Sequence, residues 1–135
     1  MKDIINLIEK AEKKWLNQLY KNCELLFSET KIPSHDHSHH LRVWNYCKEI
    51  IHALSQDVII NYDLIEGCII ASFFHDTGLT KTFNESHGKE SKILCKNYFL
   101  NNHFKLPANF DEILLAIEKH DDKNIGKNHD QYLYG

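Results

Sequence analysis

Residues 35–44, read as HDHSHHLRVW, hold four histidines within six positions, followed by Arg42, the only arginine of the chain. Imidazole nitrogen is a common metal ligand, so the cluster either binds a metal by itself or supplies one ligand to a site completed from elsewhere. A histidine-rich tract can also bind metal loosely and without function. We therefore interpret His35, His37 and His40 as loop or exposed helix residues.

His39 differs from these neighbours in its spacing to Arg42 and Val43. Positions three and four residues apart share a face of a helix, so one face presents a ligand, a cation and a core residue together. The rigid donor fork of arginine suits phosphate, but Arg42 can equally be an ordinary surface cation, and both interpretations stay open. His35 and Asp36 are candidates to support the ligands or to lie on the substrate side, and Asp36 could orient His39 or position a water molecule.

His75 and Asp76 directly follow the apolar run GCIIASFF of residues 67–74. A carboxylate in the last turn of a helix faces the negative end of the helix dipole, which a bound divalent metal would offset. The alternative is that Asp76 begins an Asp-Thr-Gly turn and that His75 is a core histidine with its nitrogens satisfied. The pair alone leaves both interpretations open.

His87 and His120 each stand at the end of an expected helix. Side chains at helix ends converge on clefts more readily than those in the middle of a helix. Isolated histidines are also commonly surface residues or helix caps, so each is a candidate ligand with an ordinary alternative.

The elements that position these residues are all expected to be helices. Apolar residues recur at helical spacing between few glycines and prolines, which predicts an all-α bundle of five or six helices. The predicted helices cover about 2–27, 38–55, 62–76, 88–101 and 110–120. Ser38 and Asn109 are expected as N-caps, and Gly78 as a left-handed C-terminal cap.

Apolar stripes predict which helix faces are buried. The stripe of the first helix is Ile5, Ile8, Trp15, Leu19 and Leu26, and that of the second is Val43, Cys47, Ile50, Ile51 and Leu54. The third helix is apolar almost all round, so we expect it to lie at the centre.

Length and composition predict one soluble domain, residues 1–135, with an N-terminal helix in 1–30 and the motif-bearing core in 35–122. The net charge of −3 and the scattered lysines argue against nucleic acid as the main partner. The four cysteines form no C-x-x-C pair, and no apolar run approaches the length of a membrane span, so we expect a cytoplasmic protein. An exposed stripe on the first helix could form a homodimer or cover the domain's own core.

The order of the motifs H-x-x-R-V (39–43), FFHDTG (73–78), HGKES (87–91) and IEKHD (117–121) resembles the HD-domain superfamily of metal-dependent phosphohydrolases. The resemblance runs from about residue 35 to 122. It implies an all-helical bundle in which His39, His75 and Asp76 hold a metal. By the same resemblance, His87 and His120 match positions that bind a second metal or the substrate phosphate.

The family usually has a closing aspartate ligand on a later helix, which this sequence lacks. Asp121, Asp122 and Asp130 are the nearby carboxylates, and Asp130 is a weak candidate for a substitute. We expect that the chain continues beyond Gly135; the other interpretation is an incomplete metal site.

The resemblance implies hydrolysis of a phosphate ester, as a phosphomonoesterase or phosphodiesterase, on a nucleotide or related small metabolite. The expected cofactor is one or two divalent ions, with Mn, Fe, Co, Ni or Zn favoured over Mg by mixed imidazole and carboxylate ligation. Asp76 and Asp36 are the expected catalytic carboxylates, and Arg42 or Lys81 is expected to contact phosphate. The alternative is a metal- or nucleotide-binding sensor or interaction domain without turnover, and a third possibility is a helical domain whose histidines are unrelated.

Overall fold

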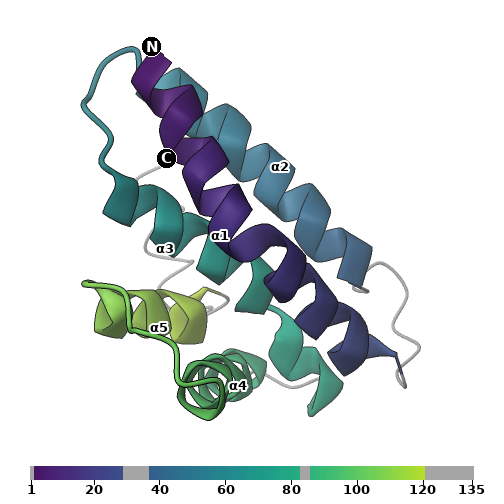
Figure 1. Ribbon diagram of the computed structural model, residues 1–135. Coiled ribbons are helices and arrows are strands. Elements are labelled where there is room, and N and C mark those ends of the chain that lie inside the picture. Colours follow the sequence, from purple (N-terminus) through teal and green to yellow (C-terminus); the bar gives the residue numbers. More distant parts are fainter. Residues whose placement is uncertain (1, 29–36, 83–85, 121–135) are drawn as a thin grey trace, which may run out of the picture.

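The computed structural model describes residues 2–28, 37–82 and 86–120, and over these ranges it is all helical (Figure 1). The elements are α1 (Lys2–Phe27), α2 (His37–Leu54), α3 (Tyr62–Phe74), the 3₁₀ helix η1 (Thr77–Thr80), α4 (His87–Asn101) and α5 (Phe110–Lys119). Their buried apolar side chains form one cluster to which all five α-helices contribute. The predicted all-α class is therefore confirmed for the described residues. None of the described helices is both long and apolar enough to span a membrane.

The buried face of α1 includes Ile8, Trp15 and Leu19 of the predicted stripe and differs from it at both ends. Its buried members are Ile4, Ile8, Ala11, Trp15, Leu19, Cys23 and Phe27, which follow one another at three- and four-residue spacing. Ile5 is 49% exposed, and Leu26 is only partly buried. Two overlapping apolar stripes start at residues 4 and 5, and packing against the rest of the bundle selected the first.

The predicted face of α2 was partly wrong as well. The helix begins at His37, so Ser38 lies inside its first turn and is not the N-cap. Ile50 and Leu54 are 55% and 48% exposed, whereas His40, Trp44 and Ile51 are buried. The inward face thus carries a histidine and a tryptophan, which a stripe drawn from aliphatic residues alone passes over.

Helix α3 lies at the centre, as predicted, and packs against α1, α2 and α5. Asn61 begins it, because the Asn61 side chain accepts a hydrogen bond from the Leu64 amide at 2.9 Å. The buried Glu66 carboxylate accepts from Trp15 Nε1 at 2.8 Å, which ties α3 to α1. The helix ends at Phe74, two residues before the predicted end, and the chain continues through His75 and Asp76 into η1.

Gly78 does not form the predicted left-handed cap, since no described glycine has a positive φ angle. It lies in η1, where its lack of a side chain permits a close approach of backbones. A Cβ built on Gly78 would stand 1.9 Å from the His87 carbonyl oxygen and 2.7 Å from the Ser91 amide nitrogen. Glycine is therefore required here for packing of η1 on α4.

Helices α4 and α5 pack against each other and complete the bundle. Asn109 does precede α5, as expected of its N-cap, but its side chain makes no capping hydrogen bond. The C-terminal ends of α3 and α5 lie beside the first residue of α4, so side chains from all three helices can meet there.

Candidate metal centre

Four histidine side chains from four segments of the sequence meet around the carboxylate of Asp76. His39 comes from the first turn of α2, and His75 and Asp76 follow the end of α3. His87 is the first residue of α4, and His120 follows the last residue of α5. All five were singled out from the sequence, and the fold brings them together.

Each oxygen of the Asp76 carboxylate faces two imidazoles. Oδ2 lies 3.1 Å from His39 Nε2 and 3.0 Å from His75 Nε2. Oδ1 lies 2.9 Å from His120 Nε2 and 3.4 Å from His87 Nε2. The two groups of possible ligands, His39–His75–Asp76 and Asp76–His87–His120, therefore share this carboxylate.

These separations suit the donors of a metal ion. Transition-metal bonds to imidazole nitrogen or carboxylate oxygen of about 2.0–2.2 Å place neighbouring donors roughly 3.0–3.5 Å apart in octahedral or tetrahedral coordination. The four nitrogen–oxygen distances around Asp76 span 2.9–3.4 Å. The side chains could accordingly hold one ion on each side of the carboxylate with little rearrangement.

Two of the histidines are oriented by backbone carbonyl groups. His75 Nδ1 lies 3.0 Å from the Ser72 carbonyl oxygen, and His120 Nδ1 lies 2.7 Å from the Ile117 carbonyl oxygen. A carbonyl oxygen only accepts, so each ring donates from Nδ1 and directs Nε2 at Asp76. Hydrogen bonding of the second ring nitrogen to a carbonyl is the usual support of a metal-ligating histidine.

The Asp76 carboxyl group is buried, with 8% of the residue exposed. Burial by itself raises the pKa of Asp76, but hydrogen bonds from His120 and His75 and the charge of those rings lower it by more. The net effect holds the pKa of Asp76 well below its usual range. The site thus favours the carboxylate, the form that binds a metal.

Ser91 links the backbone on both sides of Asp76 to α4. Its fully buried hydroxyl donates to the His75 carbonyl oxygen at 2.8 Å and accepts from the Gly78 amide at 2.7 Å. Together with the close approach at Gly78, these bonds fix the start of α4, and therefore His87, beside Asp76. The HGKES motif thus has a structural meaning in addition to its histidine.

The two residues predicted to contact phosphate are both exposed. Arg42 is exposed, and its Nη1 donates to the Ser38 hydroxyl at 3.1 Å. Lys81 is exposed at the end of η1. The remaining candidates lie outside the described residues; these are His35, Asp36, Asp121, Asp122 and Asp130, and the side chain of His37 is likewise not described.

His40 is the functional neighbour that the sequence interpretation missed. Expected to be exposed, it is fully buried, and its ring lies 5.4 Å from that of Phe27 and 5.2 Å from that of His75, between centroids. The available signal was its spacing of four residues from Trp44, which marks the inward face of α2. His40 therefore packs directly behind the metal-ligand candidates.

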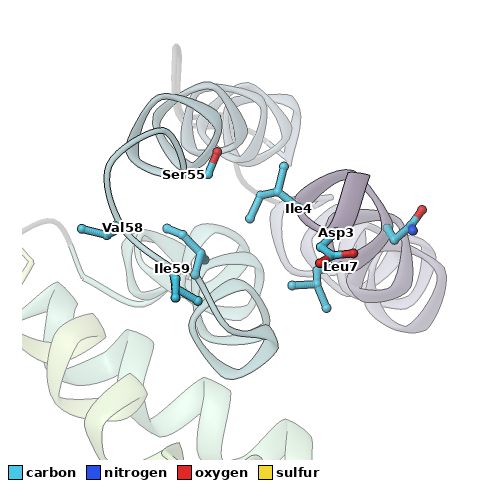
Figure 2. Close-up of a pocket in the computed structure, with 8 residues that line it drawn as sticks. Asp3, Ile4, Leu7, Ser55, Val58 and Ile59 are labelled. Atoms are coloured by element: carbon cyan, nitrogen blue, oxygen red, sulfur yellow. The ribbon is translucent and has the colours of Figure 1, made fainter. Parts of the chain in front are cut away.

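A cavity of about 440 Å³ lies between the start of α1 and the α2–α3 connection, and its lining includes Ile4, Leu7, Val58 and Ile59 (Figure 2). Its lining is mostly apolar and shares no residue with the Asp76 cluster. Its lining residues include no cationic side chain that would bind a phosphate. The Asp76 cluster is therefore the better candidate for a functional site.

No protein-family model, curated protein or solved structure matches the chain.

Proposed function

We propose that the chain is a metal-dependent phosphohydrolase of the HD-domain type. The observation that carries the proposal is the arrangement of four imidazole Nε2 atoms around the two oxygens of the Asp76 carboxylate, at 2.9–3.4 Å. The order of the motifs supplies the family, and the geometry of their side chains is the support found in the structure.

The donor chemistry favours a first-row transition metal. Imidazole nitrogen suits Mn, Fe, Co, Ni and Zn, whereas Mg prefers a shell of oxygen ligands. His39 and His75 would bind on the Oδ2 side, with His87 and His120 on the Oδ1 side. Two ions per chain are consistent with the shared carboxylate, and a divalent ion at such a site acidifies water and neutralises phosphoryl oxygens.

The protein's own residues have a defined part in this proposal. The carbonyl groups of Ser72 and Ile117 orient His75 and His120, and the buried Asp76 supplies the negative charge shared by both groups. The expected substrate is a phosphate ester of a nucleotide or related small metabolite. Arg42, three residues after His39 on α2, is the candidate to contact the phosphate.

The first experiment is metal analysis of the purified chain, followed by a panel of phosphomonoesters, phosphodiesters and nucleotides. We expect about two transition-metal ions per chain in the wild type and loss of metal and activity in Asp76→Asn, because both groups share this ligand. Asp63→Asn, in the first turn of α3, is the matched control and should keep both. His39→Ala should lower the metal content, and His52→Ala on the same helix should not.

The outcomes separate the proposed function from its alternatives. Metal bound through Asp76 without turnover on the panel would favour a metal-binding sensor or interaction domain. Wild-type metal content in Asp76→Asn would contradict the metal site itself, and with it the hydrolase.

A further inference from the structure

Helices α2 and α3 pack against each other along a seam that holds two cysteines, Cys47 on α2 and Cys68 on α3. The two helices are joined by residues 55–61 and pack against each other. His39 and Asp76 meet at one end of this seam, with Nε2 and Oδ2 3.1 Å apart. Cys47 follows His39 by eight residues, and Cys68 precedes Asp76 by eight residues.

This matched spacing places the two cysteines opposite each other. In an antiparallel helix pair, a residue eight positions after one contact on the first helix lies opposite the residue eight positions before that contact on the second. Eight residues correspond to about 12 Å along the seam. Cys47 and Cys68 are accordingly neighbours across the seam, close enough for each thiol to shift the pKa of the other, and Ser72 lies near Cys47. Both cysteines are partly exposed, so a small reagent can reach them.

We propose that Cys47 and Cys68 form a reversible disulfide bond when the chain meets a small-molecule disulfide such as oxidised glutathione. The thiolate of Cys47 attacks one sulfur of the reagent and releases one glutathione thiolate. The thiol of Cys68 then loses its proton and attacks Cys47 Sγ, displacing the second glutathione thiolate. The chain loses two electrons and two protons, and two molecules of reduced glutathione form.

The environment divides the two roles between the cysteines. The hydrogen bond from the Cys68 thiol lowers the pKa of Cys47; burial opposes this, and the Ser72 hydroxyl lowers the pKa further, leaving it below its ordinary value. The hydrogen bond to Cys47, together with burial, raises the pKa of Cys68. Cys47 is therefore the attacking thiol and Cys68 the resolving one.

The other two cysteines provide an internal contrast. Cys23 and Cys95 are fully buried, and burial raises the pKa of both thiols. The Cys23 thiol donates to the Phe73 carbonyl oxygen at 2.8 Å. Neither is available for exchange while the chain is folded.

The disulfide would act on the seam that also holds His39 and Asp76. The two sulfurs must approach to about 2.05 Å to form the bond, which draws α2 towards α3. A metal site tolerates displacements of only about 0.5 Å. We therefore expect oxidation to weaken metal binding; this consequence rests on the proposed function, whereas the disulfide itself does not.

The test treats the folded, metal-free chain with oxidised glutathione and then counts free thiols after denaturation. We expect the count to fall from four to two, the mass to fall by two hydrogens, and a cross-linked peptide to contain Cys47 and Cys68. Cys68→Ser should instead trap one glutathione on Cys47. Cys95→Ala, the matched control in the core, should still form the cross-link.

An unchanged count of four thiols in the folded chain, or a cross-link between other cysteines, would overturn the proposal. The consequence for the metal site is measured separately as Mn²⁺ binding to the reduced and oxidised chain. Equal affinity of the two forms would overturn the coupling. If neither form binds Mn²⁺, the metal site of the proposed function fails, while the thiol count still decides the disulfide.

Discussion

The close approach at Gly78 allows a sharp test of how the fold positions the metal ligands. In Gly78→Ala the new Cβ would lie 1.9 Å from the His87 carbonyl oxygen, whereas ordinary contact begins at 3.4 Å. The difference, about 1.5 Å, must be met by moving η1 away from the backbone of α4. That shift is about three times the roughly 0.5 Å that a functional site tolerates.

The expected cost has two parts. Overpacking typically lowers the free energy of unfolding by about 1–3 kcal/mol, and a clash with backbone belongs at or above the upper end. For a chain of this size, 3 kcal/mol corresponds to a fall in Tm of roughly 10–15 °C. Separation of η1 from α4 also moves Asp76 away from His87, so metal on the Oδ1 side should be lost first.

Gly67→Ala is the matched control because it is the same substitution in a buried position of α3. Its Cβ would meet a movable side-chain atom, Ile113 Cγ1, at 3.3 Å. Relief of the poor helix propensity of glycine, about 1 kcal/mol, offsets this contact, so the net change should lie within about 1 kcal/mol of zero. Urea denaturation followed by circular dichroism, with metal titration by calorimetry, measures both effects. Equal stability and equal metal stoichiometry of the two variants would refute the argument.

Three other contacts lead to predictions of the same kind. Ser91→Ala leaves two buried backbone groups without the Ser91 hydroxyl and should cost about 2–4 kcal/mol in urea denaturation. The partly exposed Ser55→Ala, which loses one bond to a carbonyl, should cost less than about 0.5 kcal/mol, and similar costs of the two variants would contradict the account. Glu66→Ala should lower the free energy of unfolding by about 1–3 kcal/mol because Trp15 Nε1 loses its buried acceptor, and an unchanged stability and tryptophan emission would count against this. Burial and the Glu66 charge raise the pKa of Tyr62 to about 12, so the neutral phenol is favoured by folding; stability from this source is present below pH 10 and is lost as the pH rises towards 12, and the loss should be absent in Tyr62→Phe.

Local spacing in the sequence predicted the helices well, because each helix is specified by apolar periodicity over neighbouring residues. It predicted their buried faces less well. In α1, apolar residues at both positions 4 and 5 leave two stripes open, and in α2 the inward face carries His40, which an aliphatic count treats as polar. The choice of face depends on the partner helix, which the local pattern does not contain.

The sequence by itself therefore determined the helical elements and the identity of Asp76 and the four histidines around it. Only the tertiary structure decided how they are arranged: two imidazoles on each carboxylate oxygen, with Arg42 directed to Ser38 instead. It also decided that Gly78 serves a close backbone contact, a role that turn propensity cannot reveal. The physical reason is that residue types and local spacing fix which groups are available, whereas distances between groups on different helices are set by the packing of the whole bundle.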